Sequence, residues 1–277
     1  MPGRAGDPAD GRYIPRVKRS TRRYLVQGTL YVVFVLVVLF VVLSADWERI
    51  QPYFFNPEIA ASLFPDIVLT AAKNTVIYTL IAFVGGVLLG LVLALMKLSP
   101  VLPYRWLATG FIELFRGLPA LLVIFAFAFA VPIALEWRPP GGSTGAGLIG
   151  LIIVSSAYIA ETIRAGIEAV PKGQTEAARS LGLNPLWTMI TVVLPQAFRI
   201  ITPPLTNELV IIIKDTSLLF IVGMALDQRE LTTFARDALS STASATPLVV
   251  AALLYLVITL PLTQLVAKLE RHNKRGR

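Results

Sequence analysis

The sequence contains no cysteine and a single histidine, His272. The absence of cysteine excludes disulfide bonds and thiol chemistry, and one histidine argues against a metal centre or a histidine base. Charged residues are also scarce: they make up 15% of the 277 residues, whereas a soluble domain carries closer to a quarter. No P-loop motif occurs, so the chain is not expected to bind ATP itself.

The sequence is rich in apolar residues, with a mean hydropathy of +0.70. Five runs have no charged residue: Tyr24 to Ala45, Asn74 to Met96, Gly117 to Leu135, Pro139 to Ala160, and Ala238 to Ala267. A helix needs about 20 apolar residues to cross the hydrocarbon core of a bilayer. The sequence therefore predicts an all-α integral membrane protein, a polytopic helical bundle.

Basic residues gather at both ends of the chain, which has a net charge of +8. Lys and Arg concentrate in cytoplasmic segments of membrane proteins, so this charge indicates orientation rather than nucleic-acid binding. We expect both termini in the cytoplasm and about six spans: 24–45, 67–96, 104–137, 146–168, 195–213 and 247–267. Residues 1–23 are polar and rich in Gly, Pro and Arg, and are expected to be disordered.

A polar segment with helical features, residues 171–190, separates two of these spans. Thr175 precedes the acidic Glu176 and is a candidate N-cap. Gly182 is expected to end the first helix, and Asn184-Pro185 to begin a second, because Pro suits the first helical position. On these residues alone the segment is either a docking element for a partner or an ordinary amphipathic helix at the membrane surface.

The spacing within this segment carries a resemblance to a known family. Glu176-Ala177-Ala178 is followed by Gly182 and, beyond Val192, by Leu194-Pro195. This pattern resembles the EAA loop in membrane subunits of bacterial ABC importers, with Val192 in place of the usual isoleucine. Segments 74–80, 111–122, 158–174, 194–209 and 214–218 are similar to the polar amino-acid branch, the histidine, glutamine, arginine and glutamate permeases.

The resemblance implies a division of the chain and a set of partners. It places the importer domain at 66–268, with an additional span at 24–45 and a basic tail at 269–277. It implies a permease in the bacterial plasma membrane that is not itself an enzyme and holds no cofactor. Its expected partners are two cytoplasmic ATPase subunits that carry ATP and Mg, an extracytoplasmic amino-acid-binding protein, and a second, identical or homologous permease. The residues expected to couple to the ATPase are Glu176, Ala177, Ala178, Gly182 and Pro195.

Charges inside predicted spans are costly and face a cavity or a partner. Two acid–base pairs spaced three apart, Glu113 with Arg116 and Glu161 with Arg164, are interpreted as structural pairs near the inner surface. A helix break is expected after Arg116, at Gly117 and Pro119.

A second set of polar residues within the predicted spans follows three prolines, Pro195, Pro203 and Pro204, which are expected to break the helix. The candidates for a substrate path are Asn207, Glu208, Asp215, Thr216 and Ser217. Glu208 and Asp215 are two helical turns apart and so share a face. The alternative for Asp215 is a contact, together with Lys214, with lipid headgroups at the outer rim.

These observations favour the permease subunit of an importer for a polar amino acid. Because two carboxylates on one face create a negative potential, we expect arginine, lysine, histidine and glutamine to be preferred over glutamate as substrates. A secondary transporter or channel is the alternative, although such proteins often have repeated halves and none is evident here. A membrane enzyme would need clustered His, Cys or carboxylates, which the sequence does not supply.

Overall fold

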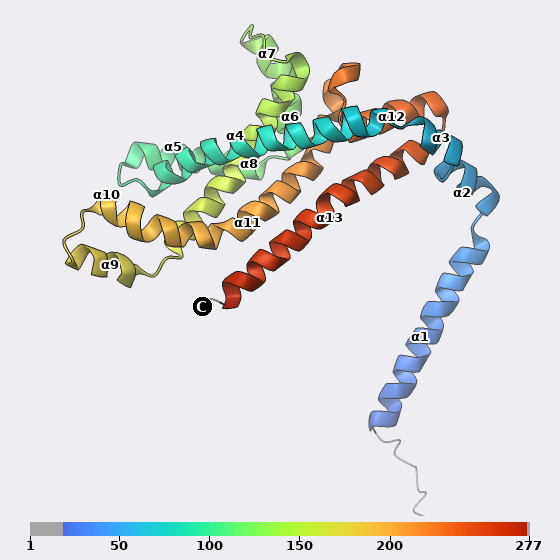
Figure 1. Ribbon diagram of the computed structural model, residues 1–277, viewed down its shortest axis with the longest axis horizontal. Helices are drawn as coiled ribbons and strands as arrows, with labels where there is room; N and C mark the ends of the chain where they lie inside the picture. The colour runs from blue at the N-terminus through green and yellow to red at the C-terminus, as the bar shows by residue number, and fades with distance from the viewer. Residues whose placement is uncertain (1–18, 276–277) are drawn as a thin grey trace, which may run out of the picture. The chain divides into compact units, whose positions relative to one another are not determined.

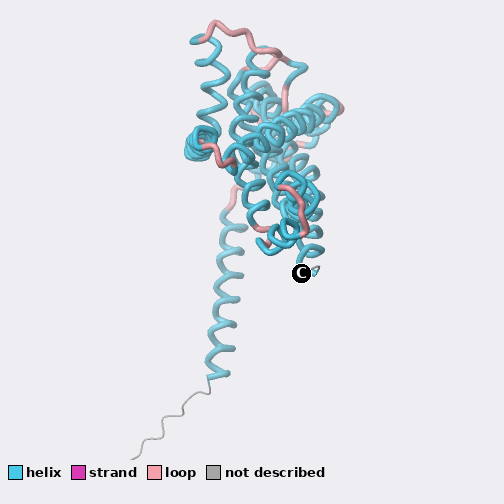
Figure 2. The backbone as a smooth tube through the Cα atoms, turned by 90° about the vertical axis from the view of Figure 1, so that its left-hand side faces the viewer, coloured by secondary structure: helices cyan, strands magenta, loops and turns pink. Residues whose placement is uncertain are grey.

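The computed structural model describes residues 19–275, and every regular element in that range is a helix (Figure 2). Within the described range, residues up to Gln51 form one compact unit and those from Pro52 onward another. The first unit contains helix α1 (Arg19–Ser44), whose described side chains from 26 to 44 are all exposed. Helix α2 (Trp47–Phe54) crosses the boundary between the units.

The second unit begins with α3 (Pro57–Ser62) and a long membrane helix made of a π-helical segment, η1 (Ile67–Ala72), continued by α4 (Lys73–Leu98). The next hydrophobic stretch is broken. It consists of α5 (Leu102–Gly117), α6 (Ala120–Phe125), the π-helical η2 (Ala126–Ala130) and α7 (Val131–Ala134). The long helix α8 (Gly142–Glu168) follows.

The cytoplasmic segment predicted at 171–190 contains α9 (Lys172–Ser180) and α10 (Pro185–Thr188). The π-helical η3 (Met189–Val193) leads into α11 (Leu194–Asp215). The chain then passes through two 3-10 helices, η4 (Thr216–Val222) and η5 (Leu226–Gln228), to α12 (Leu231–Thr242) and the long α13 (Thr246–Arg275).

Helices α4 and α8 form the centre of the second unit because small residues let their backbones approach closely. A Cβ on Gly90 would lie 3.0 Å from the carbonyl oxygen of Ser156, and one on Gly86 would lie 2.6 Å from the Ser155 hydroxyl. Helix α11 packs on α8 in the same way: a Cβ on Gly166 would overlap the side chain of Ile201. At these positions the packing of α4 on α8 and of α8 on α11 leaves no room for an added Cβ.

Four helices in the described range are long and apolar enough to cross a membrane: Val26–Ser44, Ile67–Leu98, Gly142–Glu168 and Thr246–Arg271. A fifth span is obtained if α5 and the stretch from α6 to α7, bent by 106°, are counted together. The bend lies at Gly117–Pro119, where a break was predicted. The remaining predicted span, 195–213, is a helix in the structure but is not among these apolar ones.

Two boundary predictions need correction. Helix α1 begins at Arg19, so residues 19–23 are helical rather than part of a disordered segment, while residues 1–18 lie outside the described range. At the other end, α13 continues to Arg275, so most of the predicted basic tail at 269–277 extends the last helix. The predicted and observed helix ends differ because the sequence pattern shows where the apolar residues stop, whereas a helix can continue into polar surroundings.

The prediction that Pro203 and Pro204 break a helix is wrong, because α11 runs unbroken from Leu194 to Asp215. Membrane helices tolerate proline where neighbouring helices and Ser or Thr side chains compensate for the missing backbone bonds. Thr202 and Thr206 donate hydrogen bonds back to the carbonyls of Phe198 and Thr202. The departure from α-helix comes later, in the 3-10 segment η4.

Candidate functional site

The segment between α8 and α11 forms two short helices joined by a glycine-dependent turn. Gly182 has a φ of +86°, in the left-handed region that favours glycine. Its N–H donates to the carbonyl of Arg179 (3.0 Å), and the N–H of Leu183 donates to that of Ala178 (3.2 Å). This pair of bonds is the Schellman arrangement that closes the end of a helix. The predicted helix end at Gly182 is confirmed.

The second short helix begins as expected at Asn184-Pro185. The Asn184 side chain accepts a hydrogen bond from the N–H of Trp187 (2.9 Å) and Pro185 takes the first helical position. The predicted N-cap at Thr175 is wrong, because α9 already begins at Lys172, directly after Pro171. Pro171 takes the N-cap position with an extended ψ, so the helix starts four residues earlier than the capping pattern indicated.

The surface of this turn is strongly apolar. Leu181 is 85% exposed, the highest value of any large hydrophobic residue in the described range, and Leu186 and Trp187 are also exposed. Glu176 and Ala177 are exposed on α9, whereas Ala178 is buried at 5%. Ala178 therefore packs within the chain rather than facing a partner. The sequence analysis identified neither Leu181 nor Trp187 as a surface residue; the available signal was an apolar residue beside a helix-ending glycine.

Pro195 lies apart from this turn, in the first turn of α11, and is exposed. The π-helical segment η3 separates it from α10. Because η3 continues into α11 without a break in the helical backbone, Pro195 lies at the junction between the π-helical and the α-helical segments.

An ionic cluster joins the ends of α4, α5 and α8 that lead toward the 171–190 segment. The Lys97 ammonium lies 3.1 Å from a Glu161 carboxylate oxygen and 4.0 Å from one of Glu113. Arg164 pairs with both Glu161 and Glu168. The predicted Glu161–Arg164 pair is confirmed, and it is extended by partners from other turns and helices.

The predicted pair of Glu113 with Arg116 does not form. Glu113 is nearest to Lys97, and the Arg116 guanidinium instead lies over the ring of Tyr158, 5.6 Å from its centroid. The Tyr158 hydroxyl donates to the Arg116 carbonyl (3.3 Å). The reason is the break at Gly117, which leaves Arg116 in the last turn of α5, beside α8.

The candidate path residues follow one another along the second half of α11 and into η4. Glu208 and Asp215 are partly buried, Asn207 is exposed, and Arg116 lies within electrostatic range of Glu208. In the described part of the chain neither carboxylate has an ion-pair partner within 4 Å.

The two hydroxyl residues are arranged differently. The Thr216 hydroxyl donates to the Ile213 carbonyl (2.6 Å) and that of Ser217 to the Lys214 carbonyl (2.5 Å). Thr216 is fully buried, so it closes the end of α11 and does not line a path. Ser217 is partly exposed.

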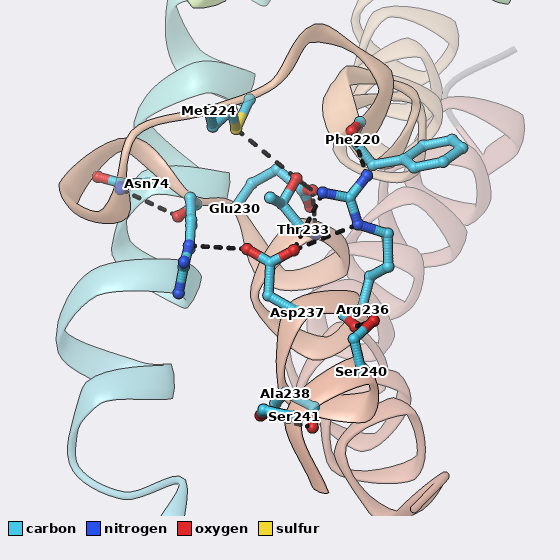
Figure 3. A network of polar contacts seen from close by, with 11 residues as sticks. Asn74, Phe220, Met224, Glu230, Thr233, Arg236, Asp237, Ala238, Ser240 and Ser241 are labelled. Carbon is cyan, nitrogen blue, oxygen red and sulfur yellow. Dashed lines mark hydrogen bonds and ion pairs between the residues drawn. The ribbon is translucent and has the colours of Figure 1, made fainter. Parts of the chain in front are cut away.

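A polar network at the other end of the unit was not anticipated from the sequence (Figure 3). Glu230 is fully buried and caps α12, accepting hydrogen bonds from the N–H groups of Thr232 and Thr233 and from the Tyr255 hydroxyl. Burial raises the pKa of the Glu230 carboxyl, and these hydrogen bonds act in the opposite direction. Nearby, Arg229 and Arg236 both pair with Asp237.

Comparison with known proteins identifies relatives that cover most of the second unit. Residues 86–275 match the family described as "Binding-protein-dependent transport system inner membrane component". The probable glutamine ABC transporter permease protein GlnM of Bacillus subtilis is 39% identical, over 73% of this chain and 91% of that protein. The arginine transport system permease protein ArtQ of the same organism is 34% identical, over 75% and 92%.

A solved structure agrees with these relatives. The crystal structure of an amino acid ABC transporter with histidines is 35% identical and superposes with a TM-score of 0.68, covering 76% of this chain and 96% of that chain. Relatives of this kind are permease subunits, and none of the three is named as a secondary transporter, so that alternative has no support.

Proposed function

This chain belongs to the inner-membrane components of binding-protein-dependent transport systems, and from that membership we propose that it conducts a polar amino acid and is driven by a separate ATPase. It is a multi-pass inner-membrane permease of the amino-acid ABC importer type. The observation that supports the coupling role is the preformed turn around Gly182, beside which Leu181, Leu186 and Trp187 are exposed.

The 171–190 segment fits the role of a docking element for an ATPase. Its two short helices are held by backbone hydrogen bonds, so the backbone that carries the exposed apolar side chains is already ordered. An apolar anchor in a fixed frame binds a groove with little ordering cost. Glu176 on the exposed side of α9 supplies a charge for a basic residue of the ATPase.

The complete transporter would contain two ATPase subunits with ATP and Mg, a second permease that is identical or homologous, and an extracytoplasmic binding protein. Both termini would be cytoplasmic, because Lys and Arg concentrate before the first span and after the last. A reporter that is active only outside the cytoplasm, fused after residue 277, should give no signal. The same reporter inserted at 50–60 should be active, and the reverse pattern would overturn the orientation.

The coupling role is tested with the whole complex in proteoliposomes. Gly182→Asp and Glu176→Lys should release the ATPase or separate ATP hydrolysis from uptake, while the permease still inserts. Mass spectrometry of co-purified subunits reports which partners remain. If both variants retain the ATPase and transport at the wild-type rate, the segment is not the coupling element.

Substrate selection is proposed to involve Glu208 and Asp215. Two partly buried carboxylates on one helix attract the ammonium group of an amino acid or a basic side chain, since a partly dry site screens charge less than water does. Arg116, near Glu208, can offset the charge of the substrate carboxylate. This arrangement favours arginine, lysine, histidine and glutamine over glutamate.

The substrate proposal is tested by competition of unlabelled amino acids against uptake, in wild type and in the variants Glu208→Gln, Asp215→Asn and the double variant. The variants should lose affinity for basic amino acids most strongly. Unchanged uptake in the double variant would remove both residues from the path. A strong wild-type preference for glutamate would contradict the charge argument.

A further inference from the structure

Polar side chains at the start of helix α4 form hydrogen bonds with the turn at residues 225–229, which is distant in the sequence. The side-chain amide of Asn74 donates to the backbone carbonyls of Asp227 (2.7 Å) and Arg229 (3.0 Å). The Tyr78 hydroxyl, one helical turn further along, donates to the carbonyl of Gln228 (2.8 Å). Three successive carbonyls of one short turn are therefore bonded to side chains of a membrane helix, and Figure 3 shows Asn74 pointing toward that turn.

The same turn is held from two other directions. The Thr144 hydroxyl of α8 donates to the side chain of Gln228 (2.8 Å). Just after the turn, the N–H of Leu231 donates to the hydroxyl of Thr75 (3.1 Å), and Glu230 is fixed by its bonds to α12 and α13. Because these contacts come from α4, α8, α12 and α13, the turn cannot move independently of the bundle.

This immobile turn displays an apolar side chain. Leu226 is 70% exposed at its tip, and Ala225 and Asp227 beside it are also exposed. The neighbourhood contains several charges, which the hydrocarbon core of a membrane does not accommodate at such density. The turn therefore faces an aqueous or headgroup environment, where an exposed leucine has no partner within the described chain.

The position of the turn indicates which partner meets it. Asn74 and Lys97 lie 23 residues apart on one helix, which corresponds to about 35 Å. Figure 1 shows α12 near one end of α4 and the pair α9 and α10 toward the other. The turn thus lies on the face opposite the proposed ATPase contact, and the family to which the chain belongs is described as dependent on a binding protein.

We propose that the turn 225–229 is a preformed contact for the extracytoplasmic binding protein, with Leu226 as its apolar anchor and Asn74 and Tyr78 as positioning residues. This inference rests on the proposed function. Binding that orders a mobile loop loses affinity, and a turn that is already ordered avoids that loss. The polar residues Asn74, Thr75 and Tyr78 of α4 accordingly position the docking turn.

The contact is tested by the affinity of the purified binding protein for the complete complex in nanodiscs. Leu226→Asp should weaken binding by more than about tenfold, as expected for loss of an apolar anchor. Leu135, which is also 70% exposed and ends α7, provides the matched control. Leu135→Asp should leave the affinity within about twofold of wild type. Equal effects of the two substitutions, or none at Leu226, would overturn the proposal.

The positioning role is tested with Tyr78→Phe, which removes one hydroxyl. Losing one hydrogen bond to the turn should weaken binding about three- to tenfold. The maximal ATPase rate at saturating binding protein should stay near that of wild type, which separates positioning from a general defect. An unchanged affinity, or a lower maximal rate with unchanged affinity, would contradict this role.

A photo-crosslinking amino acid at position 226 identifies the occupant. Capture of the binding protein supports the proposal, whereas capture of lipid or of the second permease overturns it. The wild-type complex separates this outcome from failure of the proposed function. If its ATPase activity does not respond to any binding protein, the proposed function itself fails. If it responds and the Leu226 variant responds equally, only the present inference fails.

Discussion

The left-handed turn at Gly182 allows a prediction in which one methyl group is added and nothing else changes. A Cβ at Gly182 would meet no atom within 4 Å, so Gly182→Ala causes no steric clash with neighbouring residues. Its φ of +86° is nevertheless unfavourable for any residue with a Cβ. An L-residue in the left-handed helical region costs about 1–2 kcal/mol per residue. The substitution therefore acts on the backbone alone.

That cost sets the size of the expected effect. A penalty of one or two kcal/mol corresponds to a factor of about 5–30 in an equilibrium. If the ATPase binds the turn in this conformation, Gly182→Ala should weaken the affinity of the permease for the ATPase by that factor. Asn tolerates the left-handed region better than Ala, so Gly182→Asn should fall between Ala and wild type.

Gly173 provides the matched control within the same segment. It lies in α9, a Cβ there would also meet nothing within 4 Å, and its φ is not in the left-handed range. Gly173→Ala should therefore leave the ATPase affinity unchanged or slightly improve it. The assay is titration of purified ATPase onto immobilised permease. Equal affinities for the two alanine variants would refute the claim that the conformation at Gly182 is required for docking.

Three further predictions concern packing and charge. Gly90→Ala places a Cβ 3.0 Å from a backbone oxygen of α8, so it should destabilise the protein by about 1–3 kcal/mol. Gly110→Ala, whose Cβ would meet no atom within 4 Å, should leave the stability unchanged. Thermal unfolding in detergent compares the two variants, and equal midpoints would contradict the packing argument. Lys97→Met should lower the same midpoint because Glu161 loses a partner, and adding Glu161→Gln should restore part of the loss; no recovery would argue against the pair. The raised pKa of Glu230 gives stability that is present below its unfolded pKa and lost as pH rises through the folded pKa. Glu230→Gln should therefore reduce the loss of stability as the pH rises above the ordinary pKa of a glutamate, and an unchanged pH profile would exclude this carboxyl as its source.

Local sequence signals predicted the elements whose cause is local. The turn at Gly182 and the helix start at Asn184 depend on residues within a few positions, and both were identified. The break after Arg116 was likewise predicted from Gly117 and Pro119, because Leu118 precedes a proline and adopts an extended backbone.

Features that depend on a distant partner were not predictable in the same way. Glu113 and Arg116 have the spacing of a helical pair, but Lys97 and Tyr158, from two other helices, determine where their charges lie. Asn74 donates to carbonyls 153 and 155 positions away, and a sequence pattern contains no information about backbone acceptors at that separation.

The prolines of α11 illustrate the same limit. Helix α5 ends just before Pro119, whereas α11 continues through Pro203. The difference lies in the surroundings: Pro203 is buried against neighbouring helices, and the packed backbone there is held in helical form. The candidate path residues therefore lie on an intact helix followed by a 3-10 segment, rather than on an unwound segment.

An intact α11 has a mechanical consequence for coupling. The 171–190 segment joins α8 to α11, and the contact of Gly166 with Ile201 leaves no space between these two helices close to that segment. A displacement of the segment is therefore expected to act on both helices, because they are in close contact next to it. Since α11 is continuous to Asp215, a movement of its first residues is expected to reach Glu208 and Asp215 through the unbroken helix. A helix broken at Pro203 would bend at that point instead. Continuity of α11 thus connects the proposed ATPase contact to the proposed substrate path.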